Sequence, residues 1–174
     1  MSSSTLTVWL YDTPMGAVAG ELRLRALHKR RAVLVLDAVT VIWIPGAHRP
    51  RIGHLRYPTS QVAAQRSVLG ALVGAVLLPT AVPVTDPEAV GLNAWADRLG
   101  GTGIDQPFLE DVRSRIVPGT SALLVLSSDT DLDVVRPLVQ HGLARGDVSL
   151  LRVPLGEGAV EMLRQVVDEL VPRG

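Results

Sequence analysis

The alternation of apolar and polar positions along the 174-residue chain predicts five strands and six helices. Runs rich in β-branched and apolar residues predict strands at residues 6–10, 33–44, 51–57, 122–126 and 148–153. Apolar residues at helical spacing, with Pro and Gly near the ends, predict helices at residues 14–30, 59–78, 86–99, 105–116, 129–140 and 158–171. This mixture of elements predicts an α/β (α+β) fold class.

The order of these elements resembles a ferredoxin-like, split β-α-β plan once the helices after the third strand are set aside. We therefore expect a core domain built from residues 1–58 and 104–174, with an amphipathic helix at its C-terminal end. Residues 59–103 then form an inserted helical arm. A chain of this length is expected to bury one core without disulfides, and the sequence contains no Cys.

The first helix and the two strands after it have local signals of their own. The Asp-Thr-Pro sequence at residues 12–14 can cap the helix and begin its first turn. The apolar side of this helix is predicted to include Val18, Leu22 and Leu27. The strand at residues 33–44 is almost continuously apolar, as central strands are, whereas the more polar strand at 51–57 suits an edge.

One segment of the predicted arm is apolar and spaced by glycines. Residues 67–85 contain no charged side chain. Gly70 and Gly74 stand four residues apart, so on a helix they leave a flat groove where another backbone can approach closely. Pro79 ends this run well below the roughly 20 apolar residues that a membrane-spanning helix requires. The predicted self-association face consists of Val68, Gly70, Ala71, Val73, Gly74 and Leu77.

The formal net charge is zero, but the charges are unevenly distributed along the chain. Residues 22–66 contain nine Lys or Arg and one acid, Asp37, whereas residues 67–174 contain eight Arg and fourteen acids. One interpretation is that the two parts complement each other within one domain or between subunits. The other is a surface for anionic lipid or nucleic acid. The candidate anionic-surface residues are Arg49, Arg51, His54, Arg56 and Arg66.

The sequence contains no pattern that predicts a catalytic or metal site. His48 and His54 would stand about 20 Å apart on an extended strand, too far to share one ion. The acidic residues 129–133 lack the Gly and the closing Glu of a calcium loop and suit a helix N-terminus. The glycines of residues 100–103 suit a turn between helices, because no strand precedes them and no Lys follows. We therefore expect no enzymatic activity, no cofactor and no bound metal.

Five phrases of the sequence occur together in an order typical of one family. They are the strand hairpin at 32–56, the glycine-rich segment at 68–78, Gly103-Ile104-Asp105 with Phe108-Leu109, residues 118–123 and residues 151–155. In combination they resemble DUF1269, a bacterial and archaeal family of unknown function whose members are sometimes labelled predicted membrane proteins. The family usually has two glycine-rich apolar helices, whereas residues 86–99 of this chain are charged. The resemblance implies no catalytic residues.

These observations predict a non-enzymatic protein of unknown function that forms a homo-oligomer through the glycine-faced helix. The alternatives are peripheral association with an anionic membrane, through the basic hairpin and the same helix, or a small-molecule sensor domain. We expect a cytoplasmic location, with the membrane surface as the alternative, because the first residues lack the features of a signal peptide. A nucleic-acid partner is not expected, since few aromatic side chains are present to stack on bases.

Overall fold

The computed structural model describes residues 4–55, 68–77, 92–128, 135–137, 140, 144, 146 and 148–170. Its strands are β1 (Ser4–Tyr11), β2 (Leu34–Ile42), β3 (Arg51–His54), β4 (Ser121–Ser128) and β5 (Val148–Pro154). Its helices are α1 (Gly16–Lys29), α2 (Val68–Leu77), α3 (Leu92–Arg98), α4 (Gln106–Arg115) and α6 (Ala159–Leu170). All five predicted strands are present. The helix predicted at 129–140 lies partly outside the described residues, but residues 135–137 and 140 are helical.

The five strands form one antiparallel sheet in the order β3-β2-β4-β1-β5. β4 therefore lies between β2 and β1, and β1 lies between β4 and β5. This is the split β-α-β arrangement with β3 added beside β2, so the predicted fold class is confirmed. β3 is a short edge strand, as its polar sequence predicts.

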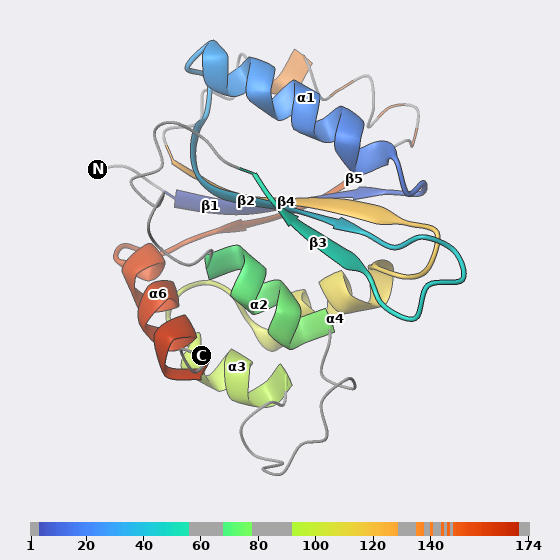
Figure 1. The fold of residues 1–174 in the computed structure, drawn as a ribbon. Helices are drawn as coiled ribbons and strands as arrows, with labels where there is room; N and C mark the ends of the chain where they lie inside the picture. Colours follow the sequence, from blue (N-terminus) through green and yellow to red (C-terminus); the bar gives the residue numbers. More distant parts are fainter. Residues whose placement is uncertain are drawn as a thin grey trace.

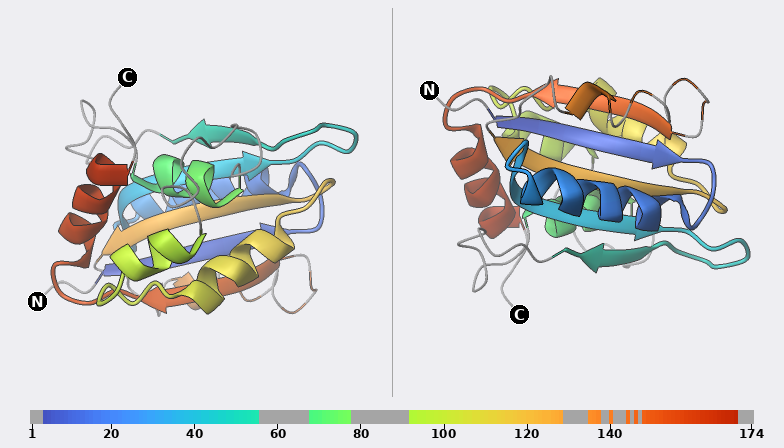
Figure 2. Two further views of the ribbon diagram at one scale, coloured as in Figure 1. Left: turned by 90° about the horizontal axis from the view of Figure 1, so that it is seen from below. Right: turned by 90° about the horizontal axis from the view of Figure 1, so that it is seen from above.

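Helices cover both faces of the sheet and make a three-layer molecule (Figure 1). α1 crosses one face, whereas α2, α3, α4 and α6 lie across the other, as the two views of Figure 2 also show. Leu69 of α2 and Trp95 of α3 share one hydrophobic core with Leu124 of β4 and Leu163 of α6. The described part of the predicted arm therefore packs in the same core as the sheet.

The alternation of residues along β1 divides the interior into two cores. Leu6 and Val8 point toward α2, α3, α4 and α6, whereas Trp9 and Tyr11 point toward α1. β4 is buried along its whole length, because it lies near the middle of the sheet and between two helical layers. Leu123 of β4 lies beside Trp9 and belongs to the core under α1.

The inward face of α1 differs from its prediction. Val18 and Leu22 are 38 % and 67 % exposed, so the prediction that they face the core is wrong. The buried residues of the helix are Ala17, Gly20, Leu24 and Leu27. Small residues face the sheet in the first half of α1 because the ring of Tyr11 occupies the space against that part of the helix.

The predicted cap of α1 at residues 12–14 is not formed either. The N-cap residue is Met15, whose own side chain makes no capping hydrogen bond. Instead, the backbone N–H of Ala17 donates to the Ser121 hydroxyl at 3.0 Å, and that hydroxyl donates to the Thr13 carbonyl at 2.6 Å. The start of α1 is thus fixed by a side chain of β4, more than 100 residues away in sequence, which no local pattern could show.

Asp37 of β2 links the sheet to the beginning of α2. The pairing of β2 with β4 shifts between Val35 and Asp37, which marks a bulge in the strand. The backbone N–H of Leu69, in the first turn of α2, donates to the Asp37 carboxylate at 2.9 Å. A carboxylate at a helix N-terminus satisfies an otherwise unpaired amide and interacts favourably with the helix dipole. Asp37, the one acid among residues 22–66, therefore stabilises the beginning of α2.

The residues around α4 follow the sequence prediction closely. Asp105 is the N-cap of α4 and accepts a hydrogen bond from the Phe108 N–H at 2.9 Å. Residues 100–103 form the expected turn between α3 and α4. The Thr102 hydroxyl donates to the Leu99 carbonyl at 2.7 Å, and Gly103 has φ of 104°. A Cβ at Gly103 would stand 2.6 Å from the Pro154 carbonyl oxygen, so this glycine permits close packing of two backbones.

Candidate functional site

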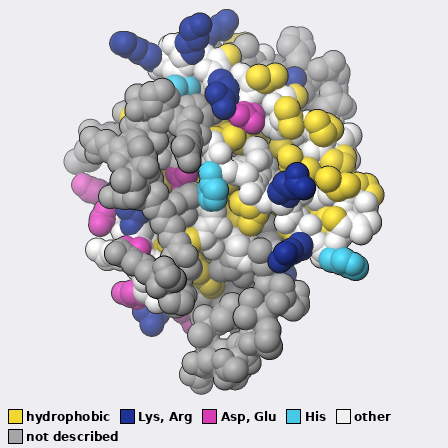
Figure 3. Space-filling model, viewed as in Figure 1, with side chains coloured by type: hydrophobic (Ala, Val, Ile, Leu, Met, Phe, Trp, Pro, Cys, Tyr) yellow, Lys and Arg dark blue, Asp and Glu magenta, His cyan; other side chains and the backbone are white. Residues whose placement is uncertain are grey.

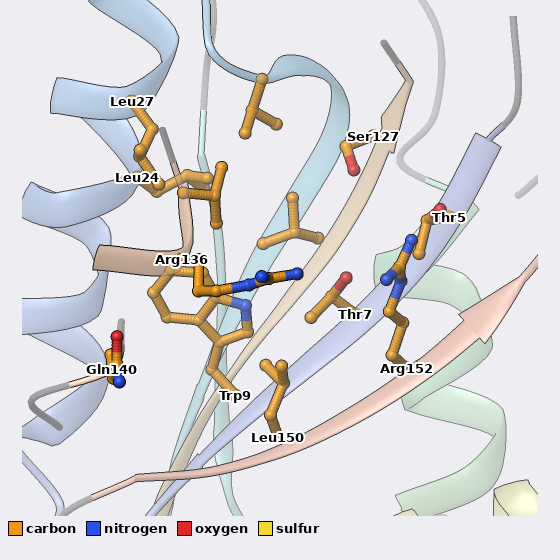
Figure 4. A pocket seen from close by; sticks show the side chains of 13 residues that line it. Thr5, Thr7, Trp9, Leu24, Leu27, Ser127, Arg136, Gln140, Leu150 and Arg152 are labelled. Atoms are coloured by element: carbon orange, nitrogen blue, oxygen red, sulfur yellow. The ribbon is translucent and has the colours of Figure 1, made fainter. Parts of the chain in front are cut away.

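A cavity of about 450 Å³ lies between α1 and the sheet, on the opposite face from α2, α3, α4 and α6 (Figure 4). β1, β4 and β5 provide its floor, α1 provides one wall, and described residues between 135 and 140 provide the other. The right view of Figure 2 shows α1 and the helical residues 135–137 on either side of β1. Cavities that bind small molecules in proteins measure about 300–1,000 Å³, so this space is large enough for a ligand.

One end of the cavity floor is polar. Thr5 and Thr7 are alternate residues of β1 and therefore point to the same face of the sheet. Thr5 lies beside Ser127 of β4, and Thr7 lies beside Arg152 of β5. The sheet register thus brings three hydroxyl groups and one guanidinium group together at this end.

The other end of the cavity is apolar. Trp9 continues the same face of β1 and pairs with Leu150 of β5, whose side chain is 38 % exposed. Leu24 and Leu27 of α1 close the wall above the sheet and are fully buried. The cavity therefore combines an apolar body with a polar end, which is the usual composition of a ligand site.

Two arginines reach into the cavity from opposite sides. Arg152 extends from β5, and Arg136 extends from the helical residues that face α1 across the opening (Figure 4). The described lining residues include no Asp and no Glu. Within the described part of the chain, neither arginine forms an ion pair. Among the described residues, no carboxylate balances the positive charge at the cavity.

The first half of α1 packs too closely on the sheet to leave a cavity there. A Cβ at Gly16 or Gly20 would overlap the side chain of Tyr11, so both glycines are needed for this contact. The spacing of these two glycines is too ordinary to predict this role from sequence. The cavity opens beside the second half of the helix, where Leu24 and Leu27 replace the small residues.

Tyr11 is buried under α1, and its hydroxyl group has no hydrogen-bond partner among the described residues. Burial raises the pKa of Tyr11 to about 12, and the positive charge of Arg23 opposes this shift only in part. The phenol is therefore neutral near pH 7. Its place is in the packing of α1 and not in the cavity lining.

The residues predicted for self-association lie on different sides of α2. Val68 and Val73 are 6 % and 3 % exposed and belong to the core shared with the sheet. Ala71 borders that core. Gly70 and Gly74 are half-buried, and a Cβ at Gly74 would meet no atom within 4 Å. The side chain of Leu77 lies outside the described residues. The two valines thus pack within the protomer, and self-association through the rest of the face stays a prediction.

The basic hairpin is described in part. Arg49, Arg51 and His54 are exposed, whereas Arg56 and Arg66 lie outside the described residues. On the face shown in Figure 3, the basic side chains stand apart from one another with hydrophobic and neutral groups between them. An anionic partner for this surface stays a prediction.

Among the described residues, no three His, Cys, Asp or Glu side chains come together as metal ligands. His48 and His54 are both exposed, at opposite ends of the segment that leads into and through β3. The acidic residues 129–133, predicted to cap a helix, lie outside the described residues.

The cavity residues were not predicted as a site from the sequence. Arg152 lies between two apolar residues of a strand. A charged residue in that position indicates that one face of the strand is not packed in a hydrophobic core. Thr5, Thr7 and Trp9 alternate with apolar residues and mark the same kind of face on β1. Arg136 has no comparable signal, because an arginine on a helix is usually a solvated surface residue.

The fold and the cavity together define the class of this protein: an α+β domain with a ferredoxin-like sheet and a ligand-sized space beneath α1. Residues 63–168 match the sequence profile of a family described as proteins of unknown function, DUF1269. The match covers more than half of the chain, and the protein belongs to the DUF1269 family. No curated protein and no solved structure matches the chain.

The family match includes β4, β5 and Arg136 but not β1 or α1. The cavity is therefore built from residues on both sides of the boundary of the match. None of the helices in the described part of the chain has the length and apolar content that crossing a membrane would require.

Proposed function

We propose that this protein is a non-enzymatic domain that binds a small, largely apolar molecule in the cavity beneath α1. The observation that carries the proposal is the cavity itself, which is about 450 Å³ in volume, partly open, and lined in large part by aliphatic side chains and Trp9. Apolar side chains that border such a space lack packing contacts on the side that faces it. A ligand that enters the cavity would recover those contacts.

The side chains around the cavity favour binding over catalysis. The described lining residues contain no His, Asp, Glu, Lys or Tyr, which are the usual groups for proton transfer. The hydroxyl groups of Thr5, Thr7 and Ser127 have no such group among these lining residues to activate them as nucleophiles. This composition supports a ligand-binding role, such as that of the small-molecule sensor domain that the sequence leaves open as an alternative.

The test is fluorescence titration with N-phenyl-1-naphthylamine, a neutral apolar probe that brightens in an apolar site. We expect saturable binding with one site per chain. Leu150→Trp should weaken binding about tenfold or more, because the larger ring fills the apolar end of the cavity. Leu22→Trp is the matched control, since Leu22 is exposed on the outer side of α1 and does not line the cavity.

Two outcomes would contradict the proposal. One is that no apolar molecule, neither this probe nor an alkyl compound followed by titration calorimetry, binds saturably to the folded wild-type protein. The other is an equal effect of Leu150→Trp and Leu22→Trp, which would place the probe elsewhere on the surface. Near- and far-ultraviolet circular dichroism of both variants should match the wild type, so that weaker binding is not a loss of fold.

Self-association through α2 is a second proposal, and the position of Gly74 supports it. This glycine leaves open space on the side of the helix turned away from the sheet core. Gly70→Leu and Gly74→Leu should each reduce the native mass measured by light scattering, because a larger side chain would hold the partner helix away. Ala19→Leu, on the exposed side of α1, is the control. An unchanged mass in both glycine variants would show that α2 is not the interface.

A further inference from the structure

We infer that the ligand of the cavity is an organic anion with an apolar body, and that Arg136 and Arg152 bind its charged group. This inference rests on the proposed function, because it names the chemical class of molecule that the same cavity would take. It is carried by two observations: the different polarity of the two ends of the cavity, and the position of two arginines at one cavity whose described lining contains no acid.

The polarity of the cavity matches a molecule with one charged end. Thr5, Thr7 and Ser127 present hydroxyl groups at the same end as Arg152, fixed by the pairing of β1 with β4 and β5. Hydroxyl groups can donate to a carboxylate, sulfonate or phosphate oxygen. At the other end, Trp9 and Leu150 provide apolar surface. A neutral hydrocarbon would make no charge-assisted interaction with the guanidinium group at the polar end.

The two arginines supply positive charge that no described lining residue balances. Both guanidinium groups are directed toward the interior space from opposite sides (Figure 4). Both arginines are exposed, so solvent screens the repulsion between them. An anion placed between them would form charge-assisted interactions with both, for which the guanidinium group is well suited geometrically.

Some arginines elsewhere on the surface are paired with acids, and others are not. Arg25 contacts Glu21 at 2.8 Å and Arg115 contacts Asp111 at 2.8 Å, each one turn along its own helix. Arg98 contacts Glu169 at 2.6 Å, between α3 and α6. Arg113 of α4, in contrast, forms no ion pair among the described residues. What distinguishes Arg136 and Arg152 is therefore their shared position at one cavity whose described lining contains no acid.

The test is displacement of N-phenyl-1-naphthylamine by a matched pair of competitors, decanoate and 1-decanol, at pH 7. The two molecules share an alkyl chain and differ in charge. We expect decanoate to displace the probe at a concentration about tenfold lower than 1-decanol in the wild type. Direct titration calorimetry with decanoate gives the same affinity without the probe.

The variants are Arg152→Gln and Arg136→Gln, with Arg113→Gln as the matched control. Arg113 lies on α4, on the other face of the sheet, and is exposed. Each cavity variant should lower the affinity for decanoate about tenfold and leave the affinities for 1-decanol and for the probe unchanged. The control should keep the wild-type preference for the anion. Decyl phosphate, tested in parallel, distinguishes a carboxylate site from a phosphate site by which anion binds more tightly.

The outcomes separate the two ideas. Equal competition by decanoate and 1-decanol, or a preference for decanoate that survives in both cavity variants, would overturn the inference and leave apolar binding intact. If neither competitor nor the probe binds by either method, the proposed function itself is wrong, and the inference falls with it. If decanoate binds by calorimetry with the expected arginine dependence while the probe does not, the inference stands and the probe is unsuitable.

Discussion

At the scale of single residues, the hydroxyl of Tyr11 is a polar group buried without a described partner. Leaving such a group unpaired costs about 1–3 kcal/mol. We expect Tyr11→Phe to raise the free energy of unfolding at pH 7 by about 1 kcal/mol, because it removes the hydroxyl and keeps the ring. Urea denaturation followed by circular dichroism measures the difference. A variant less stable than the wild type would mean that this hydroxyl is hydrogen-bonded in solution.

The same hydroxyl makes stability depend on alkaline pH. Its pKa is about 12 in the folded protein and 10.0 for an unperturbed tyrosine, so the unfolded chain loses this proton first. The contribution of Tyr11 to stability is therefore intact below pH 10 and falls as the pH rises toward 12, on the order of 2 kcal/mol in total. Because Tyr11→Phe lacks the group, the stability difference between variant and wild type should widen over this interval. A constant difference would contradict the assigned burial.

Gly20 and Gly74 form a matched pair for testing close packing. Replacement of Gly by Ala within a helix ordinarily stabilises by about 0.5–1 kcal/mol. A Cβ at Gly20 would collide with Tyr11, whereas one at Gly74 would meet nothing. We expect Gly20→Ala to destabilise by about 1–3 kcal/mol and Gly74→Ala to stabilise slightly. The destabilisation by Gly20→Ala should be smaller when Tyr11 is also replaced by Phe. Thermal unfolding of Gly20→Ala, Gly74→Ala, Tyr11→Phe and the Gly20→Ala, Tyr11→Phe double variant measures these effects, and an equal cost of Gly20→Ala in both backgrounds would contradict the prediction.

At the scale of elements, the start of α2 depends on a residue of another element. Removing the carboxylate in Asp37→Ala leaves the Leu69 amide without its acceptor, and we expect a loss of about 1–2 kcal/mol in stability. Asp37→Asn should lose less, because its side-chain oxygen can still accept the bond. Hydrogen exchange at the Leu69 amide should quicken in Asp37→Ala. Protection equal to the wild type would show that the cap does not hold α2.

The sequence predicts the positions of the strands and helices well, but it predicts less well which side chains of a helix face the core. The strands, the edge position of β3 and the cap of α4 by Asp105 follow from local patterns of apolar, turn and capping residues. The face of α1 does not, because hydrophobic spacing favours Val18 and Leu22, whereas the bulk of Tyr11 selects glycine and alanine there. A tertiary contact has replaced the local preference of the helix.

The cavity could not be predicted for a related reason. Its floor depends on the pairing of Thr7 with Val125 on one side and with Arg152 on the other. These partners lie more than 100 residues from Thr7 in the sequence, and a shift of one residue in either pairing would turn the side chains to the other face. Local patterns identify each strand but do not give the register between distant strands.

At the scale of the whole molecule, α3 and the sheet belong to one core. We therefore expect the inserted helices and the sheet to unfold together. The chain has three Trp residues, Trp9 beside α1, Trp43 after β2 and Trp95 on α3. One variant keeps only Trp9 and another keeps only Trp95, with Phe at the other two positions. In each variant, the urea midpoint measured by fluorescence should equal the midpoint measured by circular dichroism. An earlier fluorescence transition for Trp95 would instead make the arm a separate unit.

The central position of β1 has a consequence for how the chain acquires its structure in the cell. β1 is synthesised first, but its two neighbours in the sheet are β4 and β5, which end at Ser128 and Pro154. At about 5–20 residues per second, translation brings β5 out on the order of ten seconds after β1. Until β4 and β5 have been synthesised, neither edge of β1 has its native strand partner. The sheet is thus expected to close at the end of synthesis, and the nascent N-terminal strand is a natural substrate for a chaperone that binds exposed apolar segments.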